Sequence, residues 1–243
     1  MHSTKTSIFT FEDRSSDSPF IERIWQAQSE RSGPFLSIAM GHWEMVVTKG
    51  FGGTMVTLRG PESRVTRLPC PAGGEWVGIR FRIGTVMPHL PASGLVDESI
   101  NLPDAGARSF WLHGSTWELP DFENAESFVA KLVRKGLLMR DRVVDDAQRK
   151  QLDRISARSA QRHFVRTTGL TQNTIRQIER ARYAAILLQN GTSMAHVVSD
   201  AGYYDQPHLC RALKRFIGQT PAQIAAHATP LSLLYKTAPP TPR

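Results

Sequence analysis

The amino-acid sequence predicts an α+β protein with a β-rich N-terminal region and an all-helical C-terminal region. Short apolar runs cut by glycine and proline fill residues 35–83, whereas helical periodicity and helix-capping residues fill residues 142–223. The helical region also carries the positive excess. Residues 140–243 hold 16 Lys and Arg against 7 Asp and Glu, and residues 1–139 hold 14 against 15, which together make the net charge of +8. This asymmetry indicates an anionic partner for the helical region alone.

The composition argues against secreted, disulfide-bonded and membrane-spanning classes of protein. The two cysteines, Cys70 and Cys210, are too few for a disulfide framework or a metal cluster. The first residues lack the apolar core of a secretory signal, and no run approaches the roughly 20 apolar residues that a membrane span needs. We therefore expect a cytoplasmic protein with no membrane partner and no cofactor.

The N-terminal region, residues 1–138, is predicted to be an antiparallel β-barrel or sandwich, because Gly and Pro punctuate it at the spacing of short strands. The expected strands are Phe35–Met40, Trp43–Thr48, Thr54–Leu58, Arg64–Leu68 and Trp76–Ile83. The first 30 residues are polar, with one short helix expected around Pro19–Gln28. Leu95–Leu102 fits either a loop or a short strand, and Phe122–Leu138 keeps a helical period.

The C-terminal region, residues 139–229, is predicted to be wholly helical and to be followed by a flexible tail at 230–243. The switch in charge balance places the boundary between the two regions near residues 137–142. Capping residues and apolar periods predict helices at Arg142–Lys150, from Ser156 through Thr168, from Thr171 to Gln189, at Met194–Asp200, from Asp205 to Phe216, and after the Thr220–Gln223 capping box.

The stretch Ala201–Phe216 predicts a turn followed by a basic amphipathic helix. Gly202 suits the chain reversal, and Asp205 is a good N-cap. The apolar stripe consists of Leu209, Leu213 and Phe216. The opposite face carries polar and basic side chains that suit the major groove of DNA, namely Gln206, His208, Arg211, Lys214 and Arg215. The alternative is an ordinary surface helix with solvated charges.

A second copy of this pattern lies upstream and favours DNA binding over that alternative. The helix that Ser156 caps buries Phe164, and its opposite face carries Arg158, Gln161, Arg162 and Arg166. Arg and Gln pair bidentately with guanine and adenine. We call these two helices the reader helices. A helix of roughly 18 residues, about 27 Å long, joins them, so they could reach successive major-groove turns about 34 Å apart.

Residues 156–223 resemble the DNA-binding domain of the AraC/XylS family of bacterial transcription regulators. The matching positions are Ser156-x-Arg158-x-x-Gln161-Arg162-x-Phe164, Gly169, Arg180, Ala184, Leu187-Leu188, Ala201–Leu209, Arg211, Lys214, Phe216, Gly218 and Thr220-Pro221. The resemblance implies two helix-turn-helix units joined by a linker helix, and sequence-specific promoter binding. Only residues 142–155 precede the first reader helix, where the family usually has two helices, and Cys210 stands where a small hydroxyl residue is more usual.

The N-terminal half is similar to the sensor domains of such regulators. Its segment Gly78–Gly84 resembles the Gly-x-Arg-Phe-x-x-Gly strand of a cupin-like subgroup, which implies a small β-barrel that holds an effector or mediates dimerisation. The five tryptophans of this half fit either an apolar pocket or an ordinary core. The candidate partners are double-stranded DNA, RNA polymerase, a small-molecule effector and a second copy of the chain.

A cupin-like metal-dependent enzyme with a helical accessory module is the alternative function. Cupin-like barrels often hold iron or zinc through His and Glu, and the side chains that could do so here are His42, Glu44, His89 and His113. His89 and His113 lie in connections rich in Pro and Gly, whereas metal ligands converge from firmly placed strands. We therefore expect a regulator with no metal and no catalytic residues, and not an enzyme.

Overall fold

The computed structural model describes residues 9–50, 52–149 and 156–227, which belong to two compact units. The first unit comprises Met1–Ser32, His42–Pro61 and Cys70–Thr171, and the second comprises Gly33–Gly41, Glu62–Pro69 and Gln172–Arg243. The division into a region 1–138 and a region 139–229 stays a prediction. The tail expected at 230–243 lies outside the described residues.

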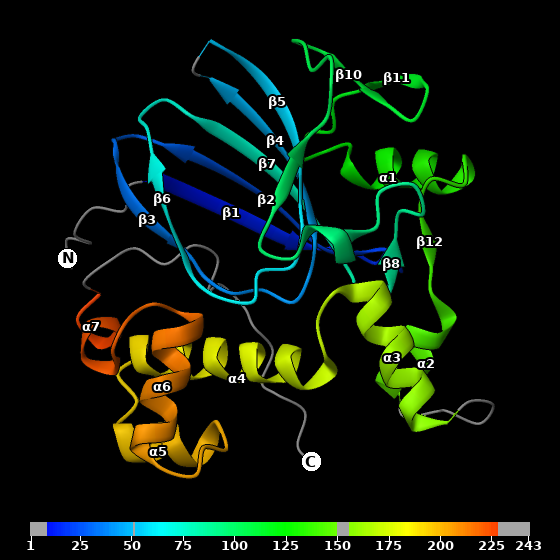
Figure 1. The fold of residues 1–243 in the computed structure, drawn as a ribbon. Helices are drawn as coiled ribbons and strands as arrows, with labels where there is room; N and C mark the ends of the chain where they lie inside the picture. The colour runs from blue at the N-terminus through cyan, green and yellow to red at the C-terminus, as the bar shows by residue number, and fades with distance from the viewer. Residues whose placement is uncertain (1–8, 51, 150–155, 228–243) are drawn as a thin grey trace. The chain divides into compact units, whose positions relative to one another are not determined.

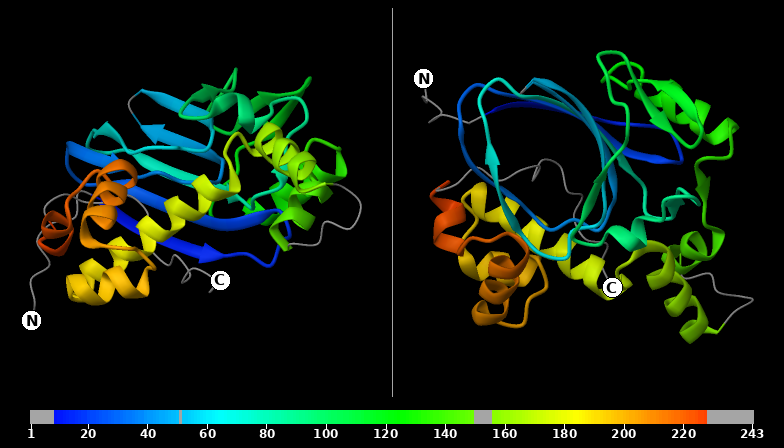
Figure 2. Two further views of the ribbon diagram at one scale, coloured as in Figure 1. Left: turned by 60° about the horizontal axis from the view of Figure 1, so that its bottom comes forward. Right: turned by 45° about the horizontal axis from the view of Figure 1, so that its top comes forward.

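A six-stranded antiparallel sheet organises the first unit (Figure 1). Its order is β1 (Phe9–Ser15), β2 (Ile21–Ser29), β7 (Glu75–Phe81), β4 (Glu44–Gly50), β5 (Gly53–Arg59) and β9 (Ser99–Asn101). The sheet is strongly curved, as the right-hand view in Figure 2 shows. The strands predicted at 43–48, 54–58 and 76–83 are thereby confirmed as β4, β5 and β7.

Alternating side chains of this sheet form the core of the first unit. Met45 of β4 and Ile79 of β7 are fully buried on one face, and Phe81 stacks on Trp43 with 4.0 Å between ring centroids. Helix α1 (Ala125–Arg134) adds the buried side chains of its apolar stripe to the same cluster. The helix predicted at 122–138 is therefore confirmed in a shorter form, and its buried side chains belong to the core of the first unit.

Of the predicted barrel or sandwich, a closed barrel is not formed by the described strands. Strands β1 and β9 end the sheet and do not pair with each other, so the sheet is open. The prolines of residues 84–120 remove ladder donors, which keeps the elements there short. They are β8 (Thr85–Val86), η1 (Ala92–Leu95), β10 (Ser109–Leu112) and β11 (Ser115–Glu118), and β8 pairs with β12 (Met139–Arg140). Of Leu95–Leu102, residues 99–101 are strand β9.

The helix predicted around Pro19–Gln28 is wrong, because this segment is strand β2 and pairs with both β1 and β7. The pairing of β2 with β7 shifts register between Ile21 and Arg23. A bulge of this kind lets Ile21 and Ile24 both enter the core, where each is fully buried although they are three residues apart. The bulge thus produces two buried residues three positions apart, a spacing that is also typical of a helix.

The Gly-x-Arg-Phe-x-x-Gly segment has a structural explanation at each marked position. A Cβ at Gly78 would overlap the indole ring of Trp25, so only glycine fits beneath that ring. Arg80 Nε donates to Glu44 Oε1 at 2.8 Å in a buried ion pair, and Phe81 belongs to the core. Gly84 has φ 90°, a region that favours glycine.

The described residues of the second unit form four helices and a small two-stranded sheet. Strands β3 (Gly33–Ser37) and β6 (Thr66–Cys70) pair with each other, and they match two predicted strands. Helices α5 (Met194–Asp200), α6 (Gln206–Phe216) and α7 (Pro221–Ala225) each pack against α4 (Gln172–Gln189) (Figure 1). Helices α2 (Arg142–Arg149) and α3 (Ala157–Thr168) pack together within the first unit. The predicted helices of residues 142–223 are confirmed.

Candidate nucleic-acid interface

The second reader helix, α6, is held at its start by local hydrogen bonds. Gly202 has φ 67° and makes the turn after α5. Asp205, in extended conformation, accepts a hydrogen bond from the backbone N–H of His208 at 2.7 Å, which is an N-cap. Leu209 and Leu213 are fully buried, so the helix has one fixed inner face. The predicted DNA-facing side chains of α6 are all exposed, namely Gln206, His208, Arg211, Lys214 and Arg215.

Arg180 of α4 braces the turn that precedes α6. Its Nε donates to the carbonyl of Ala201 at 3.1 Å, and a terminal nitrogen donates to the carbonyl of Gly202. Its guanidinium carbon lies 4.5 Å from the ring centroid of Tyr203, and this ring meets the imidazole of His208 edge-on at 5.1 Å. Burial raises the pKa of Tyr203 to about 12, although the charge of Arg180 acts in the opposite direction. Arg180 is therefore a structural residue of this helix-turn-helix.

The first reader helix, α3, is likewise capped at both ends. Ser156 Oγ accepts from the backbone N–H of Ser159 at 3.2 Å, and Gly169 ends the helix with φ 81°. Ala160, Phe164 and Thr168 are buried at spacings of four residues. A Cβ at Gly169 would overlap the side chain of Val96, so the end of α3 lies close against the segment after η1.

Arginines follow the exposed side of α3 at every fourth residue. Arg158, Arg162 and Arg166 are exposed and lie one turn apart, opposite the buried stripe, with Gln161 exposed beside them. Three guanidinium groups on one helix face suit phosphate oxygens and guanine edges. The structure thus presents all the predicted side chains of α3 to solvent. Whether they touch DNA stays a prediction.

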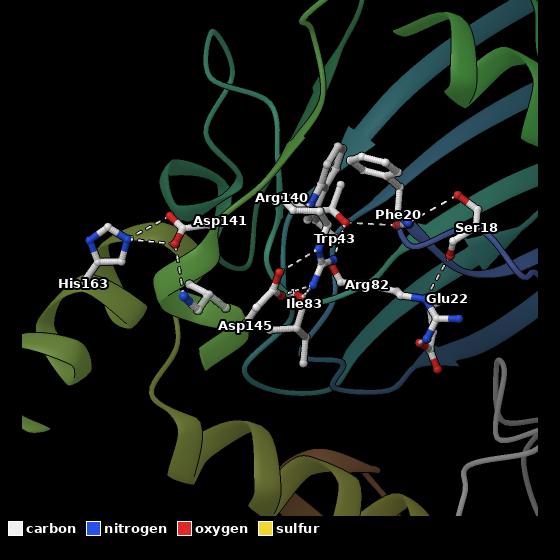
Figure 3. A network of polar contacts seen from close by, with 12 residues as sticks. Ser18, Phe20, Glu22, Trp43, Arg82, Ile83, Arg140, Asp141, Asp145 and His163 are labelled. Carbon is white, nitrogen blue, oxygen red and sulfur yellow. Dashed lines mark hydrogen bonds and ion pairs between the residues drawn. The ribbon is translucent and has the colours of Figure 1, made fainter. Parts of the chain in front are cut away.

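Several residues that shape the interface escaped the sequence analysis. His163 of α3 hydrogen-bonds through Nε2 to the carboxylate of Asp141, at 2.8 and 3.0 Å (Figure 3). Arg140 contacts the carboxylate of Asp145 and donates to the carbonyl of Ile83 at 2.9 Å. The contact partners of His163 and Arg140 are distant in sequence or belong to no motif. The one signal in the sequence is that charged residues lie beside the predicted boundary between the two regions.

The side chains considered for a metal are engaged otherwise. Glu44 is 1 % exposed and bound to Arg80, and the rings of His89 and His113 stack at 3.7 Å. Among the described residues, no group of three or more His, Cys, Asp and Glu side chains could hold a metal ion. The described part of the chain also contains no helix that is both long and apolar enough to cross a membrane.

The capped helix pair α5–α6 and the turn between them define a helix-turn-helix, and comparison with known proteins agrees. Residues 154–227 match the family model of a helix-turn-helix domain. The HTH-type transcriptional regulator RipA of Corynebacterium diphtheriae is 37% identical over 76 residues, which are 31% of this chain and 23% of RipA. The match thus spans less than a quarter of that relative. No solved structure matches the chain.

Residues 154–227 are therefore a helix-turn-helix domain of the AraC/XylS type, and the resemblance is confirmed for this segment. The cupin-like resemblance of the N-terminal half has no counterpart among these matches. It stays a prediction.

Proposed function

We propose that this protein is a transcription regulator that binds DNA in a sequence-specific way through α3 and α6. The observation that carries the proposal is the exposure of Arg and Gln side chains on both reader helices of a helix-turn-helix domain. Each helix would enter the major groove, with Arg211 and Gln206 of α6 and Arg158, Gln161 and Arg162 of α3 at base edges. Helix α4, with 18 residues, is about 27 Å long and would separate two adjacent half-sites of one orientation.

The N-terminal region would supply control by a small effector. Two features of its sheet support this proposal. The ion pair between Arg80 and Glu44 is buried, which costs desolvation free energy. The Nε1 of Trp25 is buried and has no hydrogen-bond partner among the described residues, so a polar ligand atom could accept from it. A second copy of the chain and RNA polymerase remain candidate partners, and the proposal includes no catalytic activity.

The proposal is tested by selecting duplexes that bind the full chain from a random library and measuring affinity for the selected duplex and a scrambled one. We expect the selected duplex to bind more tightly by roughly 10³-fold or more, as specific sites do. Arg211→Ala should weaken binding to the selected duplex by about 1–3 kcal/mol, because a bidentate base contact is lost. Arg134→Ala, an exposed helix arginine of α1, is the matched control and should leave affinity unchanged.

Equal affinity for both duplexes would contradict the proposal and leave a nonspecific binder of nucleic acid. The metal-dependent enzyme, the alternative from the sequence, gains no support from the described side chains. Stoichiometric iron or zinc in the purified protein, together with the absence of DNA binding, would support the metal-dependent enzyme instead.

A further inference from the structure

His163 lies at the edge of the exposed arginine stripe of α3 and contacts two charged groups. Its Nε2 faces the two carboxylate oxygens of Asp141 at 3.0 and 2.8 Å (Figure 3). Its Nδ1 faces a terminal guanidinium nitrogen of Arg166 at 3.2 Å. Arg166 is one of the predicted DNA-contacting residues, so a single imidazole links a reader side chain to the segment between β12 and α2.

The two contacts indicate which ring nitrogen of His163 carries the proton. A guanidinium only donates hydrogen bonds, so Nδ1 of His163 must accept with its lone pair. Nε2 then carries the proton and donates to the carboxylate of Asp141. This is the neutral Nε2–H tautomer. Uptake of one proton from solvent at Nδ1 would break the hydrogen bond from Arg166 and place two positive charges side by side.

Asp141 is a fixed, ionised anchor for this imidazole. Its backbone N–H donates to the carbonyl of Gly84 at 2.7 Å, and its carboxylate accepts from Val144 N–H at 3.1 Å and Thr167 Oγ1 at 3.2 Å. Burial acts to raise the pKa of Asp141, but the hydrogen bonds from His163, Val144 and Thr167 outweigh it and lower that pKa below its ordinary value. The carboxylate therefore stays charged beside the imidazole of His163.

Among the residues that the structure describes, no other charged side chain contacts the imidazole of His163. Of the charged side chains on α2, which packs against α3, Asp145 is bound to Arg140. The others, Arg142, Asp146 and Arg149, make no hydrogen bond or ion pair with His163 among the described residues. Segment η1, which also packs against α3, carries no titratable side chain.

We propose that His163 is a positioning residue for DNA binding, which holds Arg166 while neutral and releases it toward a DNA phosphate on protonation. The inference rests on the proposed function, because it assigns Arg166 to the DNA. Proton uptake and DNA binding are then linked, and each favours the other. Affinity for DNA should therefore rise as the pH falls.

The test measures affinity of the full chain for a duplex selected from a random library, at constant ionic strength, between about pH 8 and about pH 6. For wild type we expect affinity to rise with falling pH, by at most tenfold per pH unit for one proton. His163→Gln keeps an amide donor for Asp141 but cannot take up a proton, so it should flatten this slope. Arg166→Ala should flatten it as well, and the double variant should match the single ones.

His89→Gln is the matched control, because His89 is an exposed histidine of the same unit outside both reader helices. It should leave affinity and slope unchanged. Because His208 also lies on a reader helix, the decisive quantity is the difference in slope between His163→Gln and wild type. A wild-type slope in either His163→Gln or Arg166→Ala would overturn the proposal.

Nitrogen NMR of the wild-type chain without DNA gives a second, independent readout. It should find the neutral ring of His163 as the Nε2–H tautomer at about pH 8. A predominant Nδ1–H tautomer would overturn the inference even if every variant misfolded. If wild type does not distinguish the selected duplex from a scrambled one at any pH, the proposed function has failed instead, and the NMR result still decides the state of His163.

Discussion

Tyr203 shows how a single side chain serves the turn before α6 at a cost. Its ring lies under the guanidinium of Arg180 and is 7 % exposed, but its hydroxyl is buried without a partner among the described residues. A buried hydroxyl without a hydrogen bond costs about 1–3 kcal/mol. The aromatic ring of Tyr203 therefore stabilises the turn through its contact with Arg180, whereas its hydroxyl makes no hydrogen bond with the described residues.

We predict that Tyr203→Phe keeps the ring contact and stabilises the protein by about 1 kcal/mol at neutral pH.

The free energy of unfolding of the variant should also fall less than that of wild type at alkaline pH. Burial raises the pKa of Tyr203 from 10.0 to about 12, so above pH 10 the unfolded chain loses the phenol proton while the folded chain keeps it. Wild-type stability should therefore fall as the pH rises from 10 to about 12. Denaturant unfolding of wild type and Tyr203→Phe, at neutral pH and between pH 10 and about 12, measures both effects. A variant that is less stable than wild type at neutral pH would contradict the prediction.

Gly78 is a second residue whose identity the packing dictates. We predict that Gly78→Ala destabilises the protein by about 3 kcal/mol, because its Cβ would overlap the indole of Trp25 and force β2 and β7 to shift. Gly53→Ala is the matched control, since Gly53 also lies in a strand and a Cβ there meets nothing within 4 Å. It should change the free energy of unfolding by less than about 0.5 kcal/mol. Equal effects of the two changes would show that Trp25 does not occupy this position.

At the scale of elements, helices α3, α5, α6 and α7 start by one mechanism. The side chains of Ser156, Ser193, Asp205 and Thr220 each accept a hydrogen bond from a backbone N–H three residues later. Thr220 forms a full capping box with Gln223. These bonds span a single turn, so each of these four helices carries its own start signal and needs little from the rest of the fold.

We predict that Asp205→Ala destabilises the second unit by about 1 kcal/mol, the usual cost of losing an N-cap. It should also weaken binding to a selected duplex, because the start of α6 holds Gln206 and His208 in place. Asp200→Ala, at the exposed end of α5, removes the same side chain without removing a cap and serves as the control. Thermal unfolding monitored by circular dichroism separates the two variants. Equal midpoints would mean that the cap contributes nothing.

At the scale of the whole molecule, charge is divided as the proposed function requires. The positive excess of residues 140–243 includes the exposed arginines of α3 and α6, whereas Arg180 and Arg182 of α4 bind carbonyl groups of the protein. Only part of the positive charge is therefore available to phosphates. The slope of affinity against salt concentration would count that part.

We predict that affinity for duplex DNA falls linearly on a log–log plot against salt, with a slope of about −0.9 for each phosphate neutralised. Arg162→Ala should reduce the magnitude of this slope by about 1, since Arg162 lies in the middle of the arginine stripe of α3. Arg134→Ala on α1 should leave the slope unchanged. A slope that Arg162→Ala does not alter would remove α3 from the DNA contacts.

The fold was predictable where its signals are local. The caps and apolar stripes of residues 156–223 predicted the positions of those helices, and glycine spacing predicted β4, β5 and β7. Strand β2 was missed because its bulge places Ile21 and Ile24 on one face, a spacing that a helix shares. The sequence left a barrel and a sandwich open, and the described strands form no closed barrel, because pairing at the sheet edges depends on distant strands. All nine predicted DNA-facing side chains are exposed, and their contacts with DNA stay predictions.

The sequence by itself determined the reader helices, because an N-cap and an apolar stripe act within a few residues of chain. Only the tertiary structure decided which charged side chains form ion pairs or hydrogen bonds with other side chains of the protein. Arg80 meets Glu44 across 36 residues, and His163 meets Asp141 across 22. Local propensity carries no information about such partners, because they come together only when sheet and helices have packed. For this reason the basic helix faces could be predicted from the chain, whereas the contact that holds Arg166 could not.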